Sequence, residues 1–276
     1  KMSSAVYQRD GRDVHYIPYK YDRMFDFEKI WSTKEIYEIM RDYWTYTIWM
    51  AISYVVAVHV MKKWMEDKKP LELRGLLILW NAALSIFSII GTIRVSQEFW
   101  HVVSTRPLLD SVSLSSDPNG PFLFWLFLFA ISKFFEFGDT AFLILRKKPV
   151  IFLHWYHHAT VIVYTWHSGQ EFVAAARWFM AMNFFIHSIM YGYYAISAMG
   201  IRLPKSISML LTTMQITQML IGLMMCFSVT YCKLSGRITQ QSNANLLFCF
   251  TIYGSYAVLF TNFFRQSYLV KKDKVK

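Results

Sequence analysis

Residues 206–232 read SISMLLTTMQITQMLIGLMMCFSVTYC, a run of 27 residues that carries no charge between Lys205 and Lys233. About 20 residues of helix cross the hydrocarbon core of a bilayer, so this run is long enough to span a membrane. Uncharged runs of similar length occupy residues 43–61, 76–93 and 244–264. Three more stretches can span if a few polar side chains are accepted in them: 121–145, 149–166 and 173–199. We therefore expect an all-α polytopic membrane protein with seven transmembrane helices.

The composition of the whole chain agrees with this class of protein. Hydrophobic residues make up 55% of the 276 residues and charged residues only 17%, against about 25% in soluble domains. The net charge is +11, but Lys and Arg form short clusters between the apolar runs, as they do beside membrane spans. This pattern favours the lipid bilayer and an anionic substrate at its surface as partners, and it argues against nucleic acid. The three cysteines lie in apolar runs, which is not the pattern of a disulfide framework or a zinc site.

Positive charges predict the orientation of the chain, because cytosolic loops carry an excess of Lys and Arg. Fifteen Lys and Arg lie on one side, in the 62–75, 146–148 and 202–205 loops and the tail. The loops of the other side have four, which are Arg94, Arg106, Lys233 and Arg237. We therefore expect a lumenal N-terminal segment at 1–42, a transmembrane domain at 43–264 and a basic cytosolic tail at 265–276.

Ionisable side chains inside the predicted spans gather at one depth. His154, His157 and His158 are spaced i, i+3 and i+4, so one helical face carries all three imidazoles. At 1.5 Å per residue from the cytosolic end, His157 and Tyr191 lie about 12 Å deep, and Glu136 and Gln215 about 14 Å. Such residues are functional candidates by default. The set also includes Lys133, Asp139 and His187, and Asn183 lies deeper, at about 24 Å, as a candidate supporting residue.

The pattern leaves several interpretations open. Glu136 and Asp139 can act in chemistry or can simply balance Lys133, because buried charges need partners. Gln215 can bind substrate or can hydrogen-bond a neighbouring helix. The histidines fit nucleophilic transfer of an acyl group from a thioester. They also fit a metal-dependent lipid oxidase or hydroxylase, with one metal on the three histidines and His187. A seven-helix receptor is disfavoured, because the polar layer lies in the cytosolic half.

Four sequence blocks resemble, in this order, the very-long-chain fatty acid elongase family. They are Lys133-Phe-Phe-Glu-Phe-Gly-Asp-Thr140, Phe152-Leu-His-Trp-Tyr-His-His158, Met182-Asn-Phe-Phe-Ile-His-Ser-Ile-Met-Tyr-Gly-Tyr-Tyr194 and Thr212-Thr-Met-Gln-Ile-Thr-Gln218. The second block contains an HxxHH box that desaturases share, whereas the four blocks together are specific. The similarity runs from about the first helix to the tail, and the first 40 residues show no match by inspection.

The resemblance implies a 3-oxoacyl-CoA synthase of the endoplasmic reticulum. Such an enzyme joins an acyl-CoA to malonyl-CoA, releases CO2 and CoA, and needs no metal or other cofactor. The family fold has seven helices, of which the last six form an inverted barrel around a closed acyl tunnel. His157 matches the histidine that takes the acyl group, and His187 the one that faces it. Trp155 and Tyr156 resemble the branch that acts on saturated and monounsaturated chains.

Further expectations concern the substrate and the partners. The phosphates of CoA should stay in cytosolic water, where Lys147, Lys148, Arg202 and Lys205 can meet them. Side chains of the 121–132, 173–183 and 219–232 stretches should limit the length of the acyl chain. The resemblance also implies a dilysine retrieval signal at Lys272 and Lys274. A second copy of the chain and other enzymes of the elongation cycle are the remaining expected partners.

Overall fold

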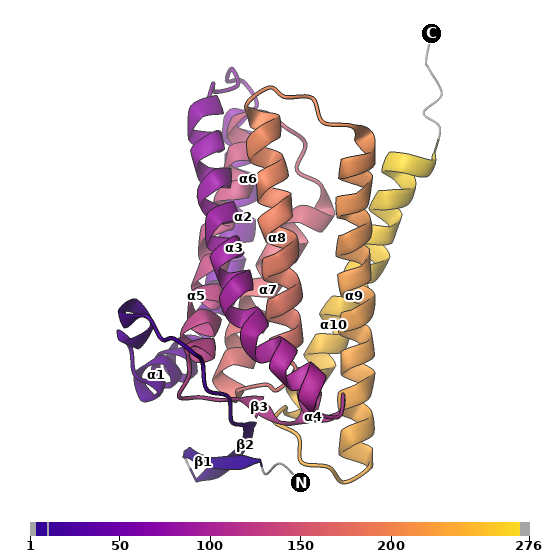
Figure 1. Ribbon diagram of the computed structural model, residues 1–276. Coiled ribbons are helices and arrows are strands. Elements are labelled where there is room, and N and C mark those ends of the chain that lie inside the picture. The colour runs from indigo at the N-terminus through magenta and orange to yellow at the C-terminus, as the bar shows by residue number, and fades with distance from the viewer. Residues whose placement is uncertain (1–3, 10, 271–276) are drawn as a thin grey trace.

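The computed structural model describes residues 4–9 and 11–270. Long helices run side by side along one axis (Figure 1). Their bounds are α2 Tyr46–Met65, α3 Arg74–Thr105, α5 Pro121–Phe135, α6 Phe137–Leu145, α7 Phe152–Glu171, α8 Ala176–Ala198, α9 Lys205–Leu234 and α10 Asn243–Phe264. We call the end at which α2, α6, α8 and α10 finish the basic end, because most of the loop lysines are there. The dilysine signal expected at Lys272 and Lys274 lies outside the described residues.

Within the described residues, four helical segments are long and apolar enough to cross a membrane: α3, the α5–α6 segment, α9 and α10. The short helix α1, Thr33–Tyr43, and α2 pass the same test together, although they are bent by 56°. The chain is thus a multi-pass membrane protein by the length and composition of its helices. The expected count of seven spans also needs α7 and α8, which carry the polar side chains of the candidate site and are therefore less apolar. That count stays a prediction.

Six helices are arranged in a closed ring. Going round it, α3 packs on α8, α8 on α9, α9 on α10, α10 on α7, α7 on α5, and α5 again on α3. Helix α2 lies outside the ring, against α6 and α7. This arrangement resembles the barrel that the family resemblance implies for the last six helices.

The other end of the molecule holds structure that the all-α expectation did not include. Strands β1, Ala5–Arg9, and β2, Arg12–Ile17, form an antiparallel hairpin, and β3, Ser115–Ser116, pairs parallel to β2. Short helical pieces at Asp26–Lys29 and Asp110–Ser113 complete this end. The sequence did not reveal this sheet because β3 is only two residues long and gives no alternating pattern.

Helix α1 begins with a capping box that fixes its start. The Ser32 hydroxyl accepts a hydrogen bond from the Glu35 backbone N–H, and the Glu35 carboxylate accepts one from the Ser32 N–H. These hydrogen bonds from Ser32 lower the pKa of Glu35. The chain then turns sharply into α2, so α1 lies across the end of the ring next to α5 and α7.

Two buried ion pairs join segments that are distant in sequence. Arg94 Nε lies 2.7 Å from Glu28 Oε1, and Arg177 Nη2 lies 3.0 Å from Glu98 Oε1. The assignment of Arg94 to a loop was therefore wrong, because α3 continues past it to Thr105 and buries its side chain. The helix can extend beyond the uncharged run because both charges in its last turns have counter-ions.

The hydrophobic interior consists of two clusters of side chains. One cluster joins α2, α3, α5, α7 and α8, and the other joins α7, α8, α9 and α10. Gly222 of α9 allows the close approach in the second cluster, because a Cβ there would lie 2.3 Å from the ring of Tyr253. A cavity lies where the two clusters meet, inside the ring.

Candidate active site

The site is built around a break between α5 and α6. Glu136 stands at this break, between Phe135 and Phe137, with only 2% of its surface exposed. Lys133 Nζ, one turn earlier, donates to Glu136 Oε1 at 2.6 Å and is itself 1% exposed. This ion pair is the contact that the charge-balance interpretation of Glu136 requires, and it leaves a role in the chemistry open. The pair is buried among helices, so both charges need further polar neighbours.

Helix α8 supplies two of those neighbours. Lys133 Nζ also donates to Asn183 Oδ1 at 3.0 Å, which fixes the orientation of the Asn183 amide. The amide nitrogen then donates to His187 Nε2 at 3.1 Å. A neutral His187 therefore carries its proton on Nδ1, the atom that faces Glu136 Oε1 at 3.6 Å. The four side chains form one continuous polar network.

Helix α7 brings His158 to the other oxygen of the carboxylate. His158 Nδ1 lies 3.9 Å from Glu136 Oε2, and both atoms are buried. Among the described residues neither atom has a hydrogen-bond partner. Buried polar atoms in native proteins are nearly always hydrogen-bonded, so two unpartnered atoms that face each other mark a place where a polar atom of a substrate can bind.

The other histidine on this side of α7 is held by a second chain of hydrogen bonds. His154 Nε2 and Thr140 Oγ1 are 2.9 Å apart, and Thr140 Oγ1 and Tyr54 Oη are 2.6 Å apart. The rings of His154 and His158 are neighbours, with centroids 4.6 Å apart. Helix α2, outside the ring, thus orients one member of the histidine cluster through α6.

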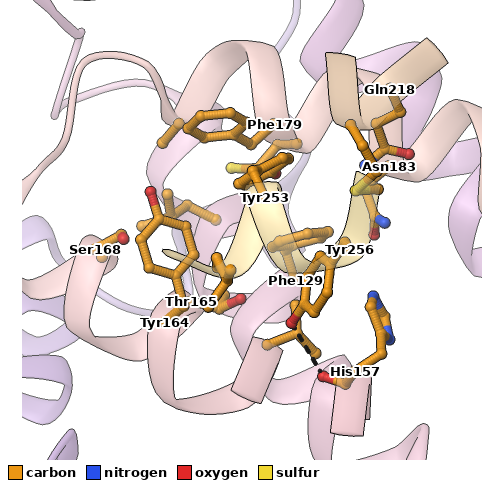
Figure 2. Close-up of a pocket in the computed structure, with 17 residues that line it drawn as sticks. Phe129, His157, Tyr164, Thr165, Ser168, Phe179, Asn183, Gln218, Tyr253 and Tyr256 are labelled. Carbon is orange, nitrogen blue, oxygen red and sulfur yellow. Dashed lines mark hydrogen bonds between the residues drawn. The ribbon is translucent and has the colours of Figure 1, made fainter. Parts of the chain in front are cut away.

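His157 faces in a different direction, toward α10 and the cavity. Its backbone carbonyl accepts a hydrogen bond from Tyr256 at 3.3 Å, which is drawn as the dashed line in Figure 2. Its ring packs on that of Tyr256, with centroids 4.9 Å apart. No described residue hydrogen-bonds the imidazole nitrogens of His157. This histidine therefore presents an unbonded ring to the cavity, whereas His154 and His187 are engaged.

The cavity runs from His157 and Asn183 toward Ser168, at the opposite side of Figure 2. The cavity is narrow, and its lining is largely aromatic and aliphatic. From His157 to Ser168 the lining follows α7 for 11 residues, or about 16 Å. Its far end is formed by small or apolar side chains, which are Leu126, Ser168, Gly169 and Ala176.

All three stretches that were expected to line the tunnel contribute residues to this cavity. Leu126 and Phe129 come from 121–132, Phe179 and Met180 from 173–183, and Met219 from 219–232. The structure adds residues of α7 and α10, which the expectation missed. Both helices are members of the ring and border the cavity, and their apolar residues carry no pattern that indicates which side faces it.

Asp139 does not share the ion pair of Lys133. Its two carboxylate oxygens accept hydrogen bonds from Trp80 Nε1 and Tyr191 Oη, both at 2.7 Å. The interpretation that both acids balance one lysine is therefore wrong for Asp139. Because Asp139 comes six residues after Lys133, its carboxylate faces α3 and α8 instead. Tyr191, which was also expected in the site, is one of its two donors.

On α9 the structure places Gln218 at the cavity rather than Gln215, the glutamine expected in the site. Gln215 is half-buried and contacts Met190 Sδ at 3.3 Å, so it does not join the polar network. Gln218, three residues later, is buried and lines the cavity with His157 and Asn183. Matching depth placed Gln215 in the site, but depth alone does not say which side of α9 faces the ring.

The four basic residues expected near CoA are not gathered in one pocket. Lys147 and Lys148 line a hollow together with Lys62, outside the ring. Arg202 is exposed in the α8–α9 loop, and Lys205 begins α9 with its ammonium 5.5 Å from the ring centre of Tyr268. Among the residues that the structure describes, no three His, Cys, Asp or Glu side chains are grouped as metal ligands would be.

Comparison with known proteins gives a consistent answer. Residues 39–276 match the sequence profile of the ELO family, described as the GNS1/SUR4 family. The chain is 44% identical over 257 residues to a Caenorhabditis elegans protein named as a candidate fatty acid elongase, number 4, which covers 93% of this chain and 88% of that protein. It is 39% identical to very long chain fatty acid elongase 6 of Drosophila melanogaster, over 93% of this chain and 82% of the relative. It is 36% identical to human very long chain fatty acid elongase 3, over 94% and 96%.

The coverage extends the similarity beyond the part found by inspection. Because 93% of the chain is matched, the match includes part of residues 1–40, for which no match was expected. The four blocks that carried the resemblance all lie within residues 39–276. The chain therefore belongs to the ELO (GNS1/SUR4) family.

Proposed function

We propose that this protein is the condensing enzyme of fatty acid elongation, a 3-oxoacyl-CoA synthase. It joins a long-chain acyl-CoA to malonyl-CoA and gives a 3-oxoacyl-CoA two carbons longer. Its relatives carry the name fatty acid elongase, which supports the reaction class. The observation that carries the proposal is the narrow apolar cavity that begins at the unbonded imidazole of His157.

In the first half-reaction, a ring nitrogen of His157 attacks the thioester carbonyl of acyl-CoA. The C–S bond breaks, CoA leaves as a thiolate and takes up a proton, and the acyl group remains on the imidazole. The acyl chain extends into the cavity toward Ser168. Asn183 and Gln218 line the cavity beside His157, so their amide groups are candidates to donate to the carbonyl oxygen as charge develops on it.

In the second half-reaction, malonyl-CoA loses CO2 and the electrons of the broken C–C bond form an enolate. The enolate carbon attacks the acyl carbonyl, the C–N bond to His157 breaks, and the leaving imidazole nitrogen takes up a proton from solvent, which restores the neutral ring. Glu136 and His158 hold two unpartnered polar atoms 3.9 Å apart, which suits them to bind the malonyl group or to move a proton. His187 and Lys133 hold the Glu136 carboxylate in position.

The proposed setting is the endoplasmic reticulum membrane, with the N-terminus lumenal and the basic end in the cytosol. CoA would then remain in cytosolic water, with the exposed Arg202 and Lys205 as candidates to bind its phosphates. The acyl chain would run from the basic end into the bilayer-spanning part of the ring. No metal or other cofactor takes part in this scheme.

The decisive experiment measures free CoA released from acyl-CoA alone by the purified full chain. A covalent route gives a burst of about one CoA per active site before malonyl-CoA is added, and an acyl adduct that mass spectrometry maps to His157. His157→Ala should abolish both. His101→Ala is the matched control, because His101 lies in the last turns of α3, at the end of the molecule opposite the basic end, and does not line the cavity.

Three results would contradict the proposal. The burst could survive in His157→Ala, or the adduct could map to another residue. Strictly sequential kinetics without a burst would instead indicate direct attack in a ternary complex, with His157 as an acid–base group. Loss of condensation in EDTA, restored by zinc or iron, would favour the metal-dependent alternative.

A further inference from the structure

A basic hollow lies at the basic end, on the outer side of the ring between α2 and the α6–α7 loop. It has a volume of about 840 Å³, and its charged lining consists of Lys62, Lys147, Lys148 and Glu66. Lys62 Nζ donates to the Val150 carbonyl at 3.2 Å, and Lys147 Nζ to the Glu66 carbonyl at 2.8 Å. An ammonium has three donors, so each lysine retains hydrogens for an anion. Three cations against one carboxylate leave the hollow positive.

Lys147 has an unusual backbone conformation for a lysine at the end of a helix. Its φ is 52°, in the left-handed region. The Lys147 N–H bonds to the Ile144 carbonyl and the Lys148 N–H to the Leu143 carbonyl, which is the helix-ending motif that normally has glycine at this place. A lysine here is strained, and the turn directs two consecutive lysines into the hollow. Strain of this kind is concentrated at functional sites.

An apolar groove continues from the hollow along the outside of the ring. It lies between α2 and α6, has a volume of about 1030 Å³, and shares Ile144 with the hollow. Ala57 and Ala141 keep it open from the two sides. From Met61 to Tyr46 the groove follows α2 for 15 residues, or about 22 Å, away from the basic end. Both helices belong to membrane-spanning segments, so this face meets lipid.

We infer that the basic hollow and the α2–α6 groove together bind one anionic glycerophospholipid. The phosphate of the headgroup lies among Lys62, Lys147 and Lys148, and an acyl chain lies in the groove. Charge complementarity selects an anionic headgroup over a zwitterionic one. Acyl-CoA does not fit both parts, because its acyl chain enters the cavity at His157, and no residue of α2 lines that cavity.

The groove touches the hydrogen-bond chain that leads to the histidines. Tyr54 and Thr140 both line it, and the Tyr54 ring stacks on Phe137 at 4.1 Å. Thr140 in turn hydrogen-bonds His154. A lipid chain in the groove therefore packs against the side chains that orient one member of the site, so the bound lipid also stabilises the active arrangement.

The test is native mass spectrometry of the detergent-purified full chain with added phosphatidylinositol, phosphatidylcholine of the same acyl chains, or CoA. We expect retention of one phosphatidylinositol per chain and little phosphatidylcholine. Lys62→Gln/Lys147→Gln removes two charges from the hollow and should weaken retention of phosphatidylinositol roughly thirtyfold. Lys63→Gln/Lys69→Gln is the matched control, because these lysines are exposed nearby but do not line the hollow.

A second variant tests the groove without changing any charge. Ala57→Phe fills the groove and should also abolish retention, whereas Ala83→Phe, at an exposed position of α3, should not. Equal retention of both lipids would overturn the proposal, as would unchanged lipid retention in Ala57→Phe. Loss of CoA binding but not of lipid in Lys62→Gln/Lys147→Gln would assign the hollow to CoA instead. A dimer that carries no lipid and dissociates in Ala57→Phe would show that a second copy covers the groove.

Discussion

Glu136 Oε2 and His158 Nδ1 face each other across 3.9 Å, and both atoms are buried without a hydrogen-bond partner among the described residues. The same carboxylate uses its other oxygen to accept from Lys133 at 2.6 Å. Glu136 therefore has one structural oxygen and one free oxygen. This division makes it possible to separate its two roles by mutation.

Glu136→Gln should lower both stability and turnover. The change leaves the buried Lys133 ammonium without a counter-charge, which costs about 3–5 kcal/mol of unfolding free energy. Lys133→Met/Glu136→Gln removes both charges and should recover most of the melting temperature. If Glu136 acts in the chemistry, turnover of the double variant stays low, as a condensation assay with labelled malonyl-CoA will measure. Recovery of wild-type turnover would show that Glu136 only balances Lys133.

Asp139→Asn provides the comparison for Glu136→Gln. Its oxygens accept from Trp80 and Tyr191, so the amide places an N–H against one of these donors and costs about 1–3 kcal/mol. We expect a lower melting temperature and an undiminished burst of CoA per folded active site. A wild-type melting temperature with no burst would place Asp139 in the chemistry.

Thr140→Val should reduce turnover by about five- to thirtyfold without changing the shape of the side chain. It leaves His154 Nε2 and the Tyr54 hydroxyl without their shared partner. Tyr54→Phe removes only the outer hydrogen bond and should have a smaller effect. Values of kcat and KM for the two variants show whether Thr140→Val has the larger effect. Equal effects, or none in Thr140→Val, would mean that the chain does not orient His154.

Product length should respond to the far end of the cavity. Leu126→Ala removes part of its closed end and should lengthen the main product by about one two-carbon step, since each buried CH2 of substrate gains about 0.8 kcal/mol. Ala176→Phe fills the same end and should shorten it. Leu128→Ala, on α5 but outside the lining, is the control. Gas chromatography of the products decides, and unchanged lengths in both variants would contradict a closed tunnel.

Arg94→Met should strongly destabilise the fold. It leaves the Glu28 carboxylate, which also accepts from Trp125, buried without its cation, at a cost of about 3–5 kcal/mol. Lys29→Met breaks the exposed pair with Asp26 and should change stability by at most about 1 kcal/mol. Melting temperatures in detergent compare the two. Similar shifts would mean that the buried pair is not needed to anchor the N-terminal segment.

Much of the helical framework was predictable from the sequence, because apolar run length is set by bilayer thickness and needs no tertiary information. The run at 206–232 became α9, Lys205–Leu234, almost unchanged. By contrast, α3 extends 12 residues past its uncharged run, because Glu28 and Arg177 neutralise its charges from distant segments. Counter-ions supplied across the fold leave no local signal in the sequence.

The sequence predicted which residues belong to the candidate site better than it predicted the contacts between them. Helical spacing correctly grouped Lys133 with Glu136, but it placed all three imidazoles on one face, whereas His158 faces Glu136 and His157 faces the cavity and Tyr256. It could not separate Asp139 from the ion pair or choose between Gln215 and Gln218, because those outcomes depend on how each helix is rotated about its axis. The lining contributed by α10 was missed for the same reason.

The pair of Glu98 and Arg177 has a consequence for biosynthesis. Glu98 is made 79 residues before its only cation partner in a described salt bridge, so at about 5–20 residues per second the carboxylate waits roughly 4–16 s on the ribosome. Arg94 has no such delay, because Glu28 precedes it. The end of α3 therefore cannot settle into its final environment until α8 has been translated, and the order of synthesis makes the insertion of α3 depend on a helix that follows it.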